Sequence, residues 1–276
     1  MKIDDLVTKY REKGYALADA RSTVCQYIIL SKIANSNFKN NITIKGGVVM
    51  HSVSKSNRRA TQDLDMDFIK YALDNEHIFN FINTLDSVDD GISVKLDGEI
   101  EELRHQDYKG KRIYIVLEDN FGNKLENKLD IGVHSQFNIE QDDYCFNIDF
   151  TNDEVNLLIN SFEQIFAEKL KSLLKFGIRS GRHKDLFDFY YLINNTNLNK
   201  NRLLEIFKIL IFDDELMREN NILDIYNRLN SIFNSRVYRA NINNPKYNWL
   251  DVSIDDIINS VLNYVKDLKL VAVYKD

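Results

Sequence analysis

The stretch from Asp63 to Phe68 constrains the fold more than any other part of the chain. Three aspartates alternate here with Leu64, Met66 and Phe68. Alternation with a period of two is typical of a β-strand, because successive side chains point to opposite faces of a sheet. The strand therefore has one apolar face, which must pack against other elements, and one acidic face.

The acidic face has two explanations that the sequence leaves open. Carboxylates two residues apart on a strand lie about 7 Å apart, and at an effective dielectric constant of about 20 they repel by roughly 2.4 kcal/mol. A divalent cation would turn this repulsion into attraction, so Asp63 and Asp65 are candidate metal ligands. The alternative is a solvated edge strand whose charges prevent aggregation.

A pair of glycines lies upstream of the acidic strand. Residues 41–45 read as a short strand that ends at Gly46 and Gly47, and residues 48–53 open a helix. Such glycines let backbone N–H groups approach a phosphate at the start of a helix, although a plain turn would also explain the pair. A phosphate-binding turn followed by paired carboxylates is typical of phosphoryl transfer.

The pattern of the chain changes near residue 160. Strand and helix patterns mix before it: a helix at 17–33, a helix at about 75–85, and two strands around a turn at 119–123, the second ending near Asp130. Afterwards the pattern is helical, at 162–176, 184–193, 203–212 and 254–268. We expect an α+β protein with a mixed sheet and flanking helices over residues 1–160 and a helical domain over 161–276.

Composition excludes several classes of protein. The 276 residues are 44% hydrophobic and contain no apolar run long enough for a membrane span, and the amino terminus lacks a signal-peptide pattern, so we expect a cytoplasmic protein. Cys25 and Cys145 have no neighbouring cysteine or histidine ligand pattern, which argues against a disulfide framework or a thiolate zinc site and favours buried thiols. The net charge of −6 argues against nonspecific coating of nucleic acid.

One segment is nevertheless strongly basic. It contains six basic residues and no acidic one: Lys169, Lys171, Lys175, Arg179, Arg182 and Lys184. A local excess of this kind suits a triphosphate or an RNA backbone, although a solvated helix face would also explain it. Lys55, Arg58 and Arg59 next to the acidic strand are a second candidate for contact with an RNA end, or else part of a solvated loop.

Two stretches resemble a known family. The stretch "KGGVVMHSVSKSNRRATQDLDM" resembles the first motif of the AbiEii/AbiGii toxin-type nucleotidyltransferases, a Gly-Gly or Gly-Ser pair followed by Arg-x-Thr-x-Asp-x-Asp. The stretch "FEQIFAEKLKSLLKFGIRSGRHKDLFDFYYL" resembles the family's later motifs, an Ala-Glu-Lys helix and then Arg/Lys-Asp-x-x-Asp. The matching residues are Arg59, Thr61, Asp63, Asp65, Lys169, Asp185 and Asp188.

The resemblance implies a nucleotidyltransferase core whose metal is held by carboxylates. Asp63 and Asp65 would hold Mg²⁺, or alternatively Mn²⁺, against the triphosphate of an NTP. Enzymes of this fold usually add a third carboxylate from a neighbouring strand. Asp130 in "KLDIGVH" is the candidate, which could bind a second metal and help deprotonate the acceptor hydroxyl, or could merely cap a loop at a strand end. Asp67 is not required by the family pattern.

The resemblance also implies which residues bind the nucleotide. Gly46, Gly47, Arg59 and Thr61 would surround the phosphates. Many relatives have a serine at the second glycine, so binding at Gly47 would rely on backbone N–H groups. Lys169 would contact the phosphates, and Asp185 would either orient Lys169 or contact the nucleotide. Lys169 and Asp185 are therefore expected to be the contribution of the helical domain to the site.

The family implies the toxin of a bacterial toxin–antitoxin, abortive-infection or phage-defence pair. Such an enzyme would transfer NMP from an NTP to an RNA acceptor, here a tRNA 3′ end, and would have a cognate antitoxin. Two alternatives stay open: an enzyme of the same fold that transfers AMP or phosphate to protein hydroxyls, and a catalytically silent module that binds RNA or the antitoxin. Identifying the acceptor that becomes labelled would separate them.

Overall fold

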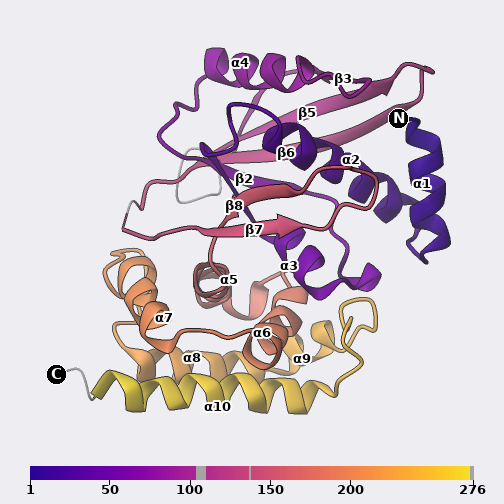
Figure 1. The fold of residues 1–276 in the computed structure, drawn as a ribbon. Helices are drawn as coiled ribbons and strands as arrows, with labels where there is room; N and C mark the ends of the chain where they lie inside the picture. Colours follow the sequence, from indigo (N-terminus) through magenta and orange to yellow (C-terminus); the bar gives the residue numbers. More distant parts are fainter. Residues whose placement is uncertain (104–109, 137, 274–276) are drawn as a thin grey trace. The chain divides into compact units, whose positions relative to one another are not determined.

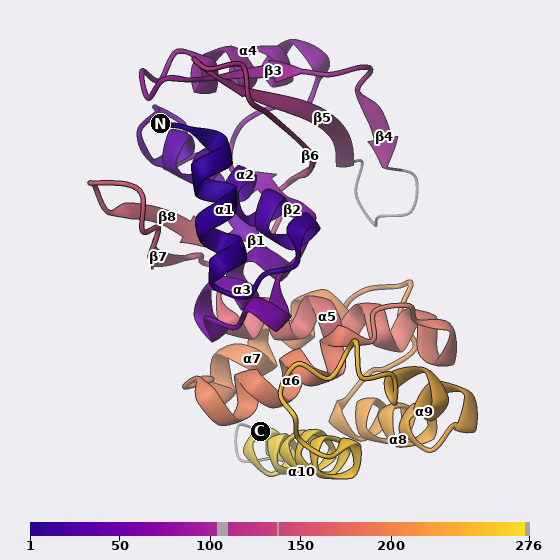
Figure 2. The same cartoon turned by 90° about the vertical axis from the view of Figure 1, so that its right-hand side faces the viewer.

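The computed structural model describes residues 1–103, 110–136 and 138–273. The chain divides into two compact units, Met1–Asn160 and Ser161–Asp276. Both are drawn in Figures 1 and 2, and each is described by itself below. Within the described residues, no helix combines the length and the apolar character that crossing a bilayer requires.

A mixed sheet forms the centre of the first unit. In the described part of the chain it has eight strands in the order β3-β5-β6-β2-β1-β8-β7, and β4 pairs with β5 (Figure 1). The pairs β1/β8 and β2/β6 are parallel, and the other pairs are antiparallel. The strands are β1 (Ile42–Lys45), β2 (Leu64–Phe68), β3 (Ile92–Leu96), β4 (Glu101–Leu103), β5 (Gly110–Asp119), β6 (Lys124–Val133), β7 (Asp142–Phe146) and β8 (Val155–Ile159).

Helices cover the apolar side of this sheet. They are α1 (Ile3–Glu12), α2 (Leu17–Ala34), α3 (Gly47–Ser54) and α4 (Asn75–Asp86). Helix α2 packs against β6 and β8, α1 packs on α2, and α4 packs on β3 (Figures 1 and 2). The side chains of Leu64, Met66 and Phe68 are fully buried, and the ring of Phe68 contacts those of Phe38 and Phe81. The apolar face expected of the 63–68 stretch is therefore the core of the first unit.

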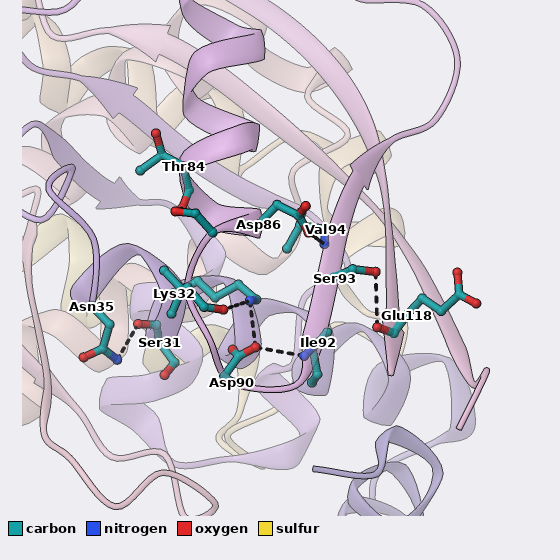
Figure 3. A network of polar contacts seen from close by, with 12 residues as sticks. Ser31, Lys32, Asn35, Thr84, Asp86, Asp90, Ile92, Ser93, Val94 and Glu118 are labelled. Atoms are coloured by element: carbon teal, nitrogen blue, oxygen red, sulfur yellow. Dashed lines mark hydrogen bonds and ion pairs between the residues drawn. The ribbon is translucent and has the colours of Figure 1, made fainter. Parts of the chain in front are cut away.

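A buried lysine joins α2 to the connection between α4 and β3. The side chain of Lys32 is fully buried, and its ammonium donates to the Val88 carbonyl (3.1 Å) and to Asp90 (2.7 Å) (Figure 3). Asp90 also accepts a hydrogen bond from the Ile92 backbone at 3.0 Å, at the start of β3. A buried charge needs such partners, so this contact specifies how α2 meets the sheet.

The second unit is helical. Its helices are α5 (Phe162–Phe176), α6 (Lys184–Asn195), α7 (Lys200–Phe207), α8 (Ile222–Phe233), α9 (Arg236–Ile242) and α10 (Ile254–Val273). Helix α10 packs against α6, α7 and α8, and α5 packs against α6, α7 and α8 (Figure 1). Phe166 of α5 lies in the core, with its ring centroid 4.8 Å from that of Phe189 and 6.3 Å from that of Phe207.

The structure confirms the α+β class and corrects two local predictions. Strand β6 continues to Val133 instead of ending near Asp130, because Asp130 to Val133 pair with β2. The interpretation of Asp130 as a strand-end cap is therefore wrong. Cys25 is buried as expected, but Cys145 is exposed, because it lies on the edge strand β7. The pattern did not reveal α1, β3, β4, β7, β8, α8 or α9.

Asp119 links the amino terminus to the turn between β5 and β6. Its carboxylate accepts hydrogen bonds from the backbone N–H groups of Ile3 (2.8 Å), Phe121 (2.9 Å) and Asn123 (2.9 Å), and from the Asn123 amide (2.9 Å). Burial alone would raise the pKa of Asp119, but these hydrogen bonds outweigh it and lower the pKa to about 2.

The lowered pKa predicts a stability change in acid. Because Asp119 releases its proton more readily when folded, its contribution is complete above the unfolded pKa of about 3.9 and is lost as the pH falls through the folded pKa of about 2. The free energy of unfolding should therefore fall less steeply between these pH values in Asp119→Asn than in the wild type. Urea unfolding at a series of pH values measures both slopes. Equal slopes would contradict this role.

Candidate active site

The acidic strand lies in the middle of a row of charges that crosses four strands. Asp65 of β2 is the register partner of Lys45 in β1 and of Asp130 in β6, and Asp130 is in turn opposite Arg112 in β5. Register partners point to the same face, and neighbouring strands lie about 4.8 Å apart. The fold thus brings Asp65 and Asp130 together on one face, with a basic residue on either side.

Asp130 is held by Arg112. The guanidinium donates Nε–H to Oδ1 at 2.7 Å and Nη2–H to Oδ2 at 2.8 Å, which is the bidentate geometry of a strong charge-assisted pair. Hydrogen bonding to Asp130 raises the pKa of Arg112. Asp130 is mostly buried, so the pair fixes the orientation of its carboxylate. Each Asp130 oxygen accepts one of these hydrogen bonds and keeps a second lone pair, so Asp130 can ligate a metal while Arg112 holds it.

Asp63 and Asp67 also have basic partners. Lys128 of β6 approaches Asp63 at 3.0 Å, where the Asp63 side chain is 43% exposed. Asp67 is buried and pairs with Lys45 at 2.5 Å. Sequence reasoning left Asp67 without a role and missed Lys45, Arg112 and Lys128, because only the strand register shows that they lie beside the aspartates.

Gly46 brings the backbone against the carboxylate of Asp65. Its φ of 69° and ψ of −136° lie where residues with a side chain are strained. A Cβ at this position would lie 2.7 Å from Asp65 Oδ2, so any side chain would displace the carboxylate. Gly46 caps helix α3, and the first N–H groups of a helix attract anions. The start of α3 and the Asp65 carboxylate therefore form one edge of the site.

Gly47 has a different partner. A Cβ here would lie 2.8 Å from Thr61 Oγ1 and 2.9 Å from Thr61 Cβ, so the Thr61 side chain occupies the place that a residue larger than glycine would need. The loop that carries Thr61 is held by Gln26 of α2, whose amide donates to the carbonyls of Thr61 (2.9 Å) and Asp63 (3.3 Å). Gly47 and Thr61 are thus a matched pair, which the sequence did not show.

The basic residues before the strand differ in exposure. Arg59 ends a short 3₁₀ turn at Asn57–Arg59 and is only 3% exposed, whereas Lys55 and Arg58 are exposed. Arg59 is therefore part of the packed structure around the site, whereas the exposure of Lys55 and Arg58 fits both contact with an RNA end and a solvated loop.

In the second unit, the structure brings Lys169 to the two aspartates of α6. The Lys169 ammonium lies 2.5 Å from Asp185 Oδ1 and 3.0 Å from Asp188 Oδ2, and all three side chains are buried. Within the described residues, the other oxygen of Asp185 is buried and has no hydrogen-bond partner. The cluster thus combines one positive charge with two negative ones and leaves one acceptor available.

The basic segment is partly compensated by acidic residues from elsewhere in the second unit. Besides the Lys169 cluster, Lys171 pairs with Asp214 at 2.5 Å. The pKa of Asp214 is lowered: burial acts in the opposite direction and is outweighed by hydrogen bonding to Lys171. The absence of acidic residues inside the segment therefore does not mean that its lysines lack acidic partners.

The residues of the first unit fit a divalent cation in chemical type. Among the described residues, no three His, Cys, Asp or Glu side chains gather as a ready metal cluster. Mg²⁺ in nucleotide enzymes, however, is usually held by one or two carboxylates together with substrate phosphates. Asp63 and Asp65 supply two carboxylates on the same strand face, and the labile, half-exposed pair with Lys128 leaves Asp63 able to turn.

The close approach of Gly47 and Thr61 predicts how substitutions at these two positions change stability. Gly47→Ala should lower the free energy of unfolding by about 1–3 kcal/mol, because the new methyl group overlaps Thr61. Gly47→Ala combined with Thr61→Gly should lose less than the sum of the two single variants, since Thr61→Gly removes the overlapping atoms. Chemical denaturation of all three variants measures this coupling.

Gly181→Ala is the matched control. A Cβ at Gly181 meets nothing within 4 Å, so this change should leave stability within about 0.5 kcal/mol of the wild type. If the effects of Gly47→Ala and Thr61→Gly simply add, the two residues are not a matched pair.

Comparison with protein-family models agrees with the motifs. The family model described as "Nucleotidyl transferase AbiEii toxin, Type IV TA system" matches residues 28–242. A crystal structure of an antigenic nucleotidyltransferase-like protein from Paracoccidioides brasiliensis is 16% identical, with a TM-score of 0.38, over 80% of this chain and 93% of that one. No curated protein matches the chain.

Proposed function

The chain belongs to the AbiEii nucleotidyl transferase toxin family of type IV toxin–antitoxin systems, and from that premise we propose that it transfers NMP from an NTP to an RNA acceptor. The acceptor proposed is a hydroxyl at a tRNA 3′ end. Mg²⁺ is the proposed cofactor, with Mn²⁺ as the alternative. The reaction would take place in the cytoplasm, where NTPs and tRNA are found.

One observation carries this proposal. The Asp65 carboxylate lies against the backbone of Gly46 at the start of α3 and next to Asp130 in the neighbouring strand. Phosphoryl transfer needs a group that accepts the charge of the phosphates beside a group that holds the metal. Here the N–H groups at the start of α3 and the Asp65 carboxylate lie side by side at Gly46. This arrangement supports binding of a metal–triphosphate complex between them.

The residues of the first unit have distinct proposed roles. Asp63 and Asp65 would hold the ion, which when bound would neutralise phosphate charge and orient the NTP. Gly46 and Gly47 would offer backbone N–H groups to the phosphates, and the buried Arg59 and the Thr61 hydroxyl would complete the binding surface.

Asp130 is the proposed general base, which would take the proton from the attacking hydroxyl of the RNA. Each Asp130 oxygen accepts one hydrogen bond from Arg112 and keeps a second lone pair, which would accept the proton of the incoming hydroxyl. The Arg112 pair would then orient the carboxylate as well as stabilise its charge. This role stays a prediction that Asp130→Asn would test.

The second unit offers a proposed phosphate-binding lysine. Lys169 is oriented by Asp185 and Asp188, which supports the interpretation that Asp185 positions the lysine. The unpartnered oxygen of Asp185 also supports a direct hydrogen bond to the nucleotide. As a toxin of a type IV system, the protein would have a cognate antitoxin, and growth arrest in phage defence or abortive infection is its proposed biological role.

Replacing Asp65 tests the proposal. We expect purified wild-type protein to transfer label from an α-labelled NTP to total bacterial tRNA in the presence of Mg²⁺. Asp65→Asn keeps the shape of the side chain but removes the charge, and should slow transfer by at least about a hundredfold, or roughly 3 kcal/mol in the barrier. The matched control is Asp143→Asn, an exposed aspartate on strand β7, which should leave the rate unchanged.

The acceptor decides between the alternatives. Label on protein instead of RNA would establish the protein-modifying alternative. Equal transfer by Asp65→Asn and the wild type would overturn the assignment of the site. RNA binding with no label on any acceptor, for all four NTPs, would favour the silent module.

A further inference from the structure

The first unit contains a cavity that the proposed transfer site does not use. Its volume is ≈580 Å³, within the range of roughly 300–1,000 Å³ that is common for ligand sites. Four tyrosines and a histidine line it: Tyr10, Tyr15, Tyr27, Tyr144 and His51. Aromatic rings stack favourably on other planar ring systems, so this lining suits a planar ligand.

The rings form a floor and two walls. Tyr10, Tyr27 and His51 are at most 7% exposed and make the floor, where the rings of Tyr27 and His51 stack at an interplanar angle of 11°. Tyr15 and Tyr144 are half-buried and make the walls. The Tyr15 hydroxyl is 2.8 Å from His51 Nε2, and the Tyr144 hydroxyl is 3.1 Å from Ser52 Oγ. These hydrogen bonds hold the wall rings in place, and both rings also make edge-on ring contacts, Tyr15 with Tyr10 and His51, and Tyr144 with Phe146.

Basic residues lie at the rim of the cavity. Lys13 and Lys55 line it together with one acidic residue, Asp149, which already binds Lys9, Lys13 and the Tyr10 hydroxyl. Lys55 is exposed and has a φ of 53°, a left-handed conformation in which glycine or asparagine is more usual. Lys13 is paired with Asp149, so Lys55 is the lysine at the rim that suits a phosphate; a lysine beside aromatic rings is a combination that proteins use to bind single-stranded nucleic acid.

Helix α3 connects the cavity to the transfer site. Gly47 at its start contacts Thr61, whereas His51 and Ser52 in its second turn line the cavity, and the whole helix of eight residues is about 12 Å long. The chain then runs from Lys55 at the rim through the exposed Arg58 to Asp63. A nucleic-acid backbone could follow these cations from the cavity to the acidic strand.

We propose that this tyrosine cavity binds an unstacked nucleobase of the single-stranded RNA acceptor, with the adjoining phosphate on Lys55. The proposal rests on the proposed function for the role of RNA as acceptor. Splayed bases of single strands are recognised by stacking on aromatic rings, and the backbone is held by lysines. Duplex RNA keeps its bases paired and would not enter the cavity.

The chain carries its own reporter for this site. Cys145 is exposed and lines the cavity, whereas Cys25 is buried, and burial raises the pKa of its thiol to about 12. Since the thiolate is the reactive form, a thiol reagent at neutral pH should modify Cys145 first. The alkylation rate of Cys145 in the full chain, with and without a short single-stranded oligoribonucleotide, therefore reports on occupation of the cavity.

We expect single-stranded RNA to slow alkylation of Cys145, and an NTP or a duplex of the same length to leave the rate unchanged. Fluorescence anisotropy with the labelled single strand should show about tenfold or greater loss of affinity in Tyr144→Leu, because stacking on one ring is removed. Lys55→Gln should lower the slope of log K against log salt by about 0.7, the value for one phosphate contact on a single strand.

Matched variants and a separate readout keep the test independent of catalysis. Tyr226→Leu, at a half-buried tyrosine of α8, and Lys95→Gln, at an exposed lysine of β3, should leave RNA affinity unchanged. Binding of labelled NTP, measured by equilibrium dialysis, should be the same in Tyr144→Leu as in the wild type. If the cavity variants lose RNA binding but the wild type shows no detectable NMP transfer, the cavity is an RNA-binding site and the proposed function is wrong.

Three results would overturn the inference. The first is a wild-type protein that binds no single-stranded RNA, even if it transfers NMP to another acceptor. The second is unchanged RNA affinity in Tyr144→Leu together with no protection of Cys145 by RNA. The protection measurement uses the wild-type protein, so it does not depend on the folding of a variant. The third is protection by NTP alone, which would assign the cavity to the nucleotide.

Discussion

The register between β1, β2 and β6 is the constraint on which the site depends. It places Lys45, Asp65 and Asp130 side by side on one face, while the opposite face of β2 is buried in the core. A shift of one residue would exchange the two faces and put carboxylates into the core. The hydrophobic packing of Leu64, Met66 and Phe68 therefore also determines where the charged groups lie.

The same register explains how the sheet tolerates so many carboxylates. Asp63, Asp67 and Asp130 each face a basic residue of a neighbouring strand, so the repulsion expected from the sequence is compensated within the protein. The two pairs with buried or mostly buried carboxylates, at Asp67 and Asp130, fix geometry, because a buried charge is stable only when it is paired. The pair at Asp63 is half-exposed and contributes little to stability, which leaves this residue free to bind a cation.

Much of this arrangement could be predicted from local patterns. The period of two predicted the strand, the glycine pair predicted the start of a helix, and the helical spacing after residue 160 predicted α5 and α6. The contact between Lys169 and Asp185 was expected from the family resemblance. Lys45, Arg112 and Lys128 could not be predicted as partners, because their positions depend on which strands pair and in what register. Thr61 fills the space beside Gly47 because of tertiary packing, which leaves no periodic pattern in the sequence. The cavity was missed for the same reason, since its residues come from α1, α2, α3 and β7.

The central claim is that Asp65 and the start of α3 together bind a metal–triphosphate complex. Equilibrium binding of an NTP, titrated with Mg²⁺ for the wild type and for Asp65→Asn, tests it most directly. The account predicts that Mg²⁺ strengthens NTP binding to the wild type by at least about tenfold, or 1.4 kcal/mol, and has little effect on Asp65→Asn. The same dependence on Mg²⁺ in both proteins would contradict it.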